Sequence, residues 1–282
     1  METLLNNFPT LSGKLMHPLL TLEVHDLLRA TTGSAECSLD LGRTIVRVDA
    51  STDHWHFAGQ EYPYITKCKD RTIYYWDGES FEPVSRYRGS LIKLVPTEWG
   101  APTFEIDGIK MLPSAQLSPY EDARRKVELI QPAGKTILDT CAGLGYFASW
   151  CLQGNARQIT SFEKNPDVIW IRSHNPWSPQ AEERYQLING DSSQEIHSLP
   201  DASFDAILHD PPRFGIAGEL YSQAFYHQLA RVLKRKGRLF HYTGTPNKLT
   251  TGRDVPNEVA KRLREAGFST EIIGDGVLAI KK

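Results

Sequence analysis

The chain has 282 residues, of which 40% are hydrophobic and 23% charged, as is typical of a folded globular protein. Its formal net charge of −2 gives no global electrostatic argument for a nucleic-acid partner, although a local basic face remains compatible with it. Four cysteines without a C-x-x-C pair argue against a disulfide scaffold and against a zinc site. Because the sequence shows neither a basic-then-apolar leader nor an apolar run long enough for a bilayer, we expect a cytoplasmic protein without a membrane partner.

The first part of the chain is expected to be mostly β-structure. Apolar residues at helical spacing predict one helix over 17–30. From 35 to 111, short alternating or aromatic segments are separated by turn residues, which predicts a small antiparallel meander or barrel. His54 and His56 share one strand face, but no third ligand is evident, so we predict no metal. We assign residues 1–112 to an N-terminal domain with a role in substrate recognition.

From residue 113 to 282, strands and helices are expected to alternate in one domain. The predicted strands are 136–139, 158–163, 185–189, 204–209 and 238–242, and the predicted helices are 119–130, 145–153, 166–173, 217–234 and 254–266. Such alternation predicts a parallel sheet with right-handed crossovers. The last segments, 270–273 and 277–281, leave no room for a helix between them and therefore predict an antiparallel hairpin at the sheet edge.

The turn after the first of these strands, TILDTCAGLGYFA at 136–148, is typical of a nucleotide site. Asp139 closes the strand, and the small residues Ala142, Gly143 and Gly145 follow it. A glycine turn between a strand and a helix allows the backbone to approach a nucleotide-like ligand closely. In open parallel sheets, such a turn lies at the carboxyl ends of the strands, where ligands bind.

The next two strands also end in carboxylates. Glu163 follows the glycines by roughly twenty residues, a position that suits the two hydroxyl donors of a ribose. Asp191 and Ser192 end the following strand, where a carboxylate and a hydroxyl suit an adenine amino group. We therefore predict that these residues hold a nucleoside together with the glycine turn.

The fourth strand runs into the segment HDPPRF, residues 209–214. Two consecutive prolines, beginning with Pro211, fix φ and remove two N–H donors, so they hold the Asp210 carboxylate rigid beside the glycine turn. His209 is either a base or a histidine that only ends the strand.

In this combination the sequence resembles the class I S-adenosylmethionine-dependent methyltransferases over residues 119–282. The resemblance rests on Asp139, Gly143, Gly145, Glu163, Asp191, the D-P-P element and the closing hairpin, with Ala148 in place of the third glycine of G-x-G-x-x-G. It implies a Rossmann-like seven-stranded sheet with an antiparallel C-terminal hairpin, and S-adenosylmethionine as cofactor.

A narrower resemblance covers about 204–255. There HDPPRF, GELYSQAFYHQL, GRLFHYTG and GRDVP look like predicted methyltransferases related to spermidine and spermine synthases. The segment ELYSQAFYHQL also resembles aminopropyltransferases, which use decarboxylated S-adenosylmethionine on the same fold. Their glycine turn is usually richer in glycine and carries an acidic residue, which Ala142 and Leu144 do not match, so the methyl donor is favoured.

The methyltransferase resemblance implies in-line methyl transfer with Asp210, Pro211 and His209 as catalytic residues. In amino-group methyltransferases an aromatic residue usually follows D-P-P directly, whereas here Arg213 takes that place and Phe214 comes next. Some RNA methyltransferases carry D-P-P-x-F, which would make Phe214 the stacking group and Arg213 a contact to phosphate or carboxylate.

The predicted acceptor is therefore RNA or another nucleobase-bearing or amine substrate. Two alternatives remain: an aminopropyltransferase of the spermidine/spermine synthase type, and a non-catalytic S-adenosylmethionine-binding regulator. The sequence does not indicate the oligomeric state.

Overall fold

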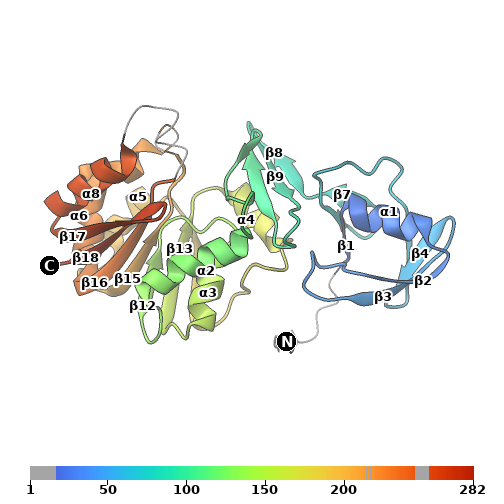
Figure 1. Cartoon of the computed structure of the whole chain (residues 1–282), viewed down its shortest axis with the longest axis horizontal. Coiled ribbons are helices and arrows are strands. Elements are labelled where there is room, and N and C mark those ends of the chain that lie inside the picture. Colours follow the sequence, from blue (N-terminus) through green and yellow to red (C-terminus); the bar gives the residue numbers. More distant parts are fainter. Residues whose placement is uncertain (1–16, 214, 216, 245–253) are drawn as a thin grey trace. The chain divides into compact units, whose positions relative to one another are not determined.

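The computed structural model describes residues 17–213, 215, 217–244 and 254–282 (Figure 1). The chain forms two compact units, Met1–Pro83 and Val84–Lys282. The sequence instead predicts a boundary between residues 112 and 113. The two divisions differ because the β-strands between residues 85 and 110 belong to the second unit, where they help to line its cavity.

In its described residues, 17–83, the first unit contains one helix and two small antiparallel sheets, in the orders β1-β6-β7 and β2-β3-β4-β5. Its elements are α1 (Leu22–Ala30), β1 (Leu19–Leu20), β2 (Gly33–Cys37), β3 (Val46–Ala50), β4 (His54–Phe57), β5 (Gln60–Pro63), β6 (Tyr74–Trp76) and β7 (Phe81–Pro83). The helix starts later than predicted because Leu19 and Leu20 pair with β6, and Thr21 then caps the helix. Trp55 is fully buried and stacks on Tyr62 at 4.5 Å between ring centroids, so the aromatic side chains of these strands pack into a hydrophobic core.

The second unit begins with a four-stranded antiparallel sheet in the order β11-β10-β9-β8. Its strands are β8 (Ser85–Tyr87), β9 (Leu91–Val95), β10 (Thr103–Ile106) and β11 (Ile109–Lys110). Two arginines attach this sheet to the helix α4 (Pro166–Ser173). Arg86 and Arg88 each lie 3.6 Å from Asp167 Oδ1, and the Arg86 guanidinium lies 3.9 Å from the centre of the Trp170 ring.

A seven-stranded sheet in the order β14-β13-β12-β15-β16-β18-β17 forms the centre of the second unit. Its strands are β12 (Thr136–Asp139), β13 (Gln158–Glu163), β14 (Tyr185–Asn189), β15 (Phe204–His209), β16 (Leu233–Tyr242), β17 (Phe268–Ile273) and β18 (Gly276–Lys281). The first five are parallel, whereas β18 is antiparallel to both β16 and β17. This confirms the predicted methyltransferase sheet and its C-terminal hairpin.

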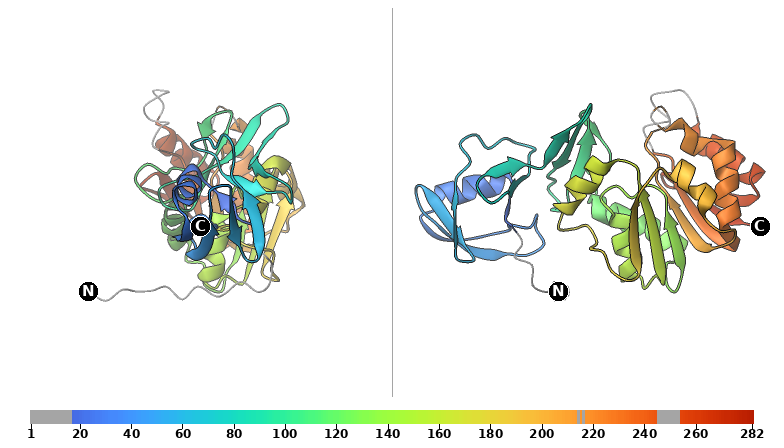
Figure 2. Two further views of the ribbon diagram at one scale, coloured as in Figure 1. Left: turned by 90° about the vertical axis from the view of Figure 1, so that its right-hand side faces the viewer. Right: turned by 180° about the vertical axis from the view of Figure 1, so that it is seen from behind.

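Helices cover both faces of this sheet (Figures 1 and 2). Besides α4 they are α2 (Pro119–Ile130), α3 (Tyr146–Gln153), α5 (Ser192–Glu195), α6 (Gln223–Val232) and α8 (Val255–Glu265), with the 3₁₀ turns η1 (Ile196–Ser198) and η2 (Gly218–Tyr221). The helix predicted over 217–234 is divided because Ser222 adopts an extended backbone and its hydroxyl accepts from Phe225 N. No helix in the described ranges is long and apolar enough to cross a membrane.

Candidate active site

A cavity of about 830 Å³ opens at the carboxyl ends of the parallel strands. Its size is in the range that accommodates a small-molecule cofactor. In the sheet order, β14, β13, β12 and β15 are successive neighbours, so the residues that follow them stand along one edge. The predicted residues that line the cavity are Ala142, Gly143, Gly145, Glu163, Asp191, Ser192, Asp210, Pro211 and Arg213. Strands β9 to β11 add an apolar wall that includes Ile92, Phe104 and Ile106.

The glycine turn is held by the backbone of β13 and by a buried cation. Ala142 N donates to Phe162 O at 2.8 Å. Gly145 has φ +79°, a conformation that glycine adopts without strain, and a Cβ there would overlap the Arg172 guanidinium. Arg172 is buried and also donates to Gly143 O at 3.4 Å. The turn therefore needs glycine at position 145 both for its backbone angle and for the packing of Arg172.

Asp139 lies behind this turn and is not among the residues that line the cavity. It is fully buried, and its carboxylate accepts from Ser161 Oγ at 2.8 Å and from Cys141 N at 3.4 Å. Burial raises the pKa of Asp139 to about 7, while Ser161 and Arg172 oppose that rise. These contacts favour a role in shaping the turn over the direct cofactor contact that the sequence predicts.

Glu163 joins the end of β13 to the turn. One carboxylate oxygen accepts from Gly143 N and the other from Asn165 N, each at 2.9 Å. Burial raises the pKa of Glu163, although these backbone donors and the Arg172 guanidinium lower it in part. Each carboxylate oxygen keeps a second lone pair, so the side chain can still accept from a diol in the cavity.

Asp191 caps the short helix α5. Its Oδ1 accepts from Ser193 N at 2.9 Å and from Ser193 Oγ at 2.7 Å, and its Oδ2 lies 2.7 Å from Lys164 Nζ. Burial tends to raise the pKa of Asp191, but Lys164 and Ser193 outweigh it, so the pKa is lowered. Ser192 is buried beside it at the cavity wall.

His209 is fully buried at the end of β15. Its Nε2 lies 3.0 Å from Leu220 O, which only accepts, so Nε2 carries the proton. Its Nδ1 then accepts from Thr140 Oγ1 at 2.6 Å. Desolvation, with His241 close by, lowers the pKa of His209 well below its usual value. Because both ring nitrogens are hydrogen-bonded within the protein and His209 is not among the residues that line the cavity, the geometry favours a structural role over the predicted catalytic one.

Asp210 faces the cavity and interacts with a buried lysine. Lys126, on α2, is 3% exposed; its Nζ lies 2.7 Å from Asp122 Oδ2 and 3.8 Å from Asp210 Oδ2. The ammonium also lies 3.8 Å from the centre of the Tyr242 ring. Burial raises the pKa of Asp210 to about 6; Lys126 lowers it, whereas Asp122 and Asp275 raise it. Lys126 thus favours the ionised form of Asp210.

The residues after Asp210 complete this end of the cavity. Pro211 is buried, and the carbonyl of Pro212 accepts from Tyr221 Oη at 3.1 Å. Arg213 is exposed at the cavity. Phe214, the predicted stacking residue, lies outside the described residues.

Sequence reasoning did not identify Lys126 or Arg172. Lys126 is the last of three consecutive basic residues in α2, Arg172 is the one basic residue of α4, and no motif marks either of them. A signal for Lys126 was nevertheless present, because it stands four residues after Asp122 in a helix that buries one face.

Comparison with known proteins agrees with this fold. The family model of the TRM5/TYW2 methyltransferase domain matches residues 95–271. An uncharacterized protein of Methanocaldococcus jannaschii is 42% identical over 206 residues, which cover 72% of this chain and 70% of that protein. Polyamine aminopropyltransferase 2 of Streptomyces coelicolor is 30% identical over 96 residues, or 31% of this chain and 17% of that protein.

Among solved structures, spermidine synthase from Thermotoga maritima superposes with a TM-score of 0.55 at 16% identity, over 70% of this chain and 72% of that chain. A spermidine synthase in complex with the transition-state analogue AdoDATO gives 0.56, also at 16% identity, over 70% and 73%. These two likenesses concern the fold. The family match extends over more than half of the chain, so the protein belongs to the TRM5/TYW2 methyltransferase family, which confirms the class I S-adenosylmethionine-dependent methyltransferase predicted from its strand ends.

Proposed function

We propose that the protein transfers a methyl group from S-adenosylmethionine to a nucleobase of an RNA acceptor. The observation that carries this proposal is the order of the strand ends in one cavity: Asp191, Glu163, the glycine turn and then Asp210. Asp191, Glu163 and the glycine turn suit a nucleoside and its amino-acid tail. Asp210 lies where the acceptor would enter.

The donor set supports S-adenosylmethionine. Glu163 retains acceptor capacity for a ribose diol, and the backbone at Gly143 and Gly145 permits close approach to the remainder of the cofactor. S-adenosylmethionine supplies an activated sulfonium methyl, so transfer depends mainly on alignment of the acceptor. Asp191 is oriented by Lys164 and Ser193 and borders the cavity at its β14 end, where an adenine would be held.

We assign to Asp210 the role of contacting the acceptor. Its carboxylate accepts a hydrogen bond from the incoming nucleobase, orients the attacking lone pair and receives the proton that the product releases. Lys126 keeps that carboxylate ionised, and the two prolines after it limit backbone movement.

Basic and aromatic groups of the β8–β11 sheet support an RNA acceptor. Arg88 and Lys110 line the cavity, and the neighbouring Tyr87 is 73% exposed. Cationic side chains neutralise phosphates, and exposed aromatic rings stack on unpaired bases. Arg213 adds a further guanidinium at the D-P-P end of the same cavity.

One observation favours aminopropyl transfer as a second candidate. Three carboxylates, Asp122, Asp210 and Asp275, act on Lys126, and Arg125 also acts on Asp275, so the carboxylates outnumber these two cations. An excess of this kind suits a cationic amine. The local identity to a polyamine aminopropyltransferase points the same way.

A binding and transfer experiment distinguishes the two candidate functions. We expect isothermal titration to give tighter binding of S-adenosylmethionine than of its decarboxylated analogue. We also expect methyl-labelled donor to transfer label to RNA from a deletion strain and not to RNA from its parent. The control variant Asp210→Asn should keep donor affinity and lose transfer. Tighter binding of the decarboxylated form, together with label-free RNA and amine acceptance, would instead establish the second candidate.

A further inference from the structure

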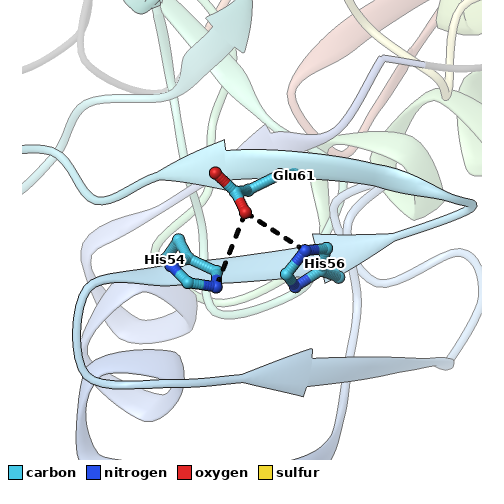
Figure 3. Close-up of side chains that lie close together, drawn as sticks. All are labelled: His54, His56 and Glu61. Carbon is cyan, nitrogen blue, oxygen red and sulfur yellow. Dashed lines mark ion pairs between the residues drawn. The ribbon is translucent and has the colours of Figure 1, made fainter.

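Two histidines and a glutamate converge on an exposed face of the first unit (Figure 3). His54 and His56 are two residues apart on β4, so their side chains share a face of the strand. Glu61 on β5 is the cross-strand partner of His56. It supplies the third group that the sequence does not reveal, because the contact arises from hairpin register and not from a sequence motif.

The distances suit coordination of one ion. Glu61 Oε2 lies 3.5 Å from His54 Nε2 and 3.3 Å from His56 Nε2. Zinc binds nitrogen and oxygen ligands at about 2.0–2.1 Å, so two ligands of a tetrahedral ion stand about 3.3 Å apart. The ligand atoms of all three residues lie within 4.8 Å of one another. Rotation of the imidazole rings would shorten the remaining distance, which is the one between the two histidine nitrogens.

The surroundings leave room for the ion and its water ligands. The side chains are 39%, 46% and 62% exposed for His54, His56 and Glu61. The two rings meet edge to face with centroids 4.9 Å apart, so both imidazoles lie beside the same Glu61 carboxylate. A divalent cation there would be attracted to the carboxylate and to a lone pair on each ring.

We propose that His54, His56 and Glu61 form a binding site for one first-row divalent metal ion, with zinc as the best fit. Two imidazoles and a carboxylate favour such ions over magnesium and calcium, which prefer oxygen ligands alone. The ion would tie β4 to β5 across the tight turn at Ala58 and Gly59. Within the described part of the chain, these residues form the one group of three or more potential ligands that come this close.

The test uses the full chain, without an affinity tag and stripped of metal with a chelator. Titration with zinc chloride should reveal one saturable site per chain, and cobalt chloride should produce visible absorption bands that zinc abolishes. The variants His56→Ala and Glu61→Gln should each weaken zinc binding by at least about tenfold. The matched control is His197→Ala, which removes an exposed histidine of the second unit and should leave the affinity unchanged.

Two results would overturn the proposal. One is the lack of a saturable zinc site in the wild-type chain, which would leave the three residues as an ion-pair cluster only. The other is zinc binding that His56→Ala and Glu61→Gln leave intact, which would place the metal elsewhere. The thermal midpoint without metal, measured for each variant, shows whether a loss of binding comes from loss of folding. His54→Gln provides a second variant if one of the others fails to fold.

Discussion

The substitution Lys126→Met tests the electrostatic basis of the site. Methionine keeps most of the apolar stem of lysine and removes only the ammonium group. The carboxylates of Asp122 and Asp210 then remain in a partly buried environment without their cation. We expect lower stability at neutral pH and a shift in the pH at which Asp210 ionises.

The distances set the magnitude. At an effective dielectric of about 20, the 2.7 Å and 3.8 Å pairs correspond to attractions of about 6 and about 4 kcal/mol. Desolvation of the buried ammonium offsets much of this, and removal of one partner of a buried pair typically costs about 3–5 kcal/mol. Both carboxylates keep 17% of their side-chain surface exposed, so water relieves part of the penalty. We therefore expect a loss of about 3 kcal/mol near pH 8.

The sign of the pH dependence follows from Asp210. Burial raises its pKa to about 6, above the value near 3.9 of an unfolded aspartate. Protonation thus favours the native state, and native stability decreases as pH rises between these values. Without Lys126, the pKa of Asp210 rises further, because the nearby cation favours the ionised carboxylate. The stability difference between Lys126→Met and wild type should accordingly be smaller near pH 5 than near pH 8, because protonation of Asp210 removes the 3.8 Å pair and leaves the 2.7 Å pair with Asp122 in place.

Urea denaturation followed by circular dichroism at about pH 5 and about pH 8 measures this difference. The control is Lys234→Met, which removes an ammonium 2.7 Å from Asp205 where both side chains are more exposed, and should cost at most about 1 kcal/mol. An equal loss of stability at both pH values in Lys126→Met would refute the reasoning, because it would show a packing defect without an electrostatic component.

Three further predictions concern the same cavity. Methyl transfer by the wild type should increase as pH rises through about 6, because the role that we propose for Asp210 requires its ionised form, and a rate that is flat from about pH 5 to about pH 8 would contradict that role. Gly145→Ala should destabilise the chain by about 2–4 kcal/mol in urea denaturation and abolish donor binding, because it combines a positive φ with overlap of Arg172. Gly143→Ala, where a Cβ would lie 3.6 Å from Phe104, should lower the stability less. An equal loss of stability in both variants would show that overlap with Arg172 is not the cause. His209→Gln should lower the thermal midpoint yet leave the pH profile of methyl transfer unchanged, whereas loss of its acidic limb would restore a catalytic role to this histidine.

The parts of the fold that follow from local chemistry were accessible from sequence. Strands β12, β13 and β15 end where their apolar runs meet Asp139, Glu163 and the D-P-P segment, respectively, because a charged residue or a proline terminates a buried strand. The prediction of one helix over 217–234 was wrong, because Ser222 has an extended backbone and caps the start of α6. The spacing of apolar residues does not indicate such an interruption. The N-terminal meander divides into separate sheets for a related reason: strand pairing there is long-range, and turn residues do not specify which strands meet.

The candidate site shows the same separation between local and long-range information. Backbone contacts of the turn, such as Gly143 N to Glu163, join strand ends whose order the fold class already fixes. Lys126 reaches Asp210 only because α2 packs beside β15 and β16, and its spacing from Asp122 does not predict this long-range contact. A buried cation is costly unless it is paired, and Asp122 and Asp210 supply the partners of Lys126. The sequence thus predicts the residues of the donor site. The contact of Lys126 with Asp210, in contrast, depends on packing between elements that are distant in the chain.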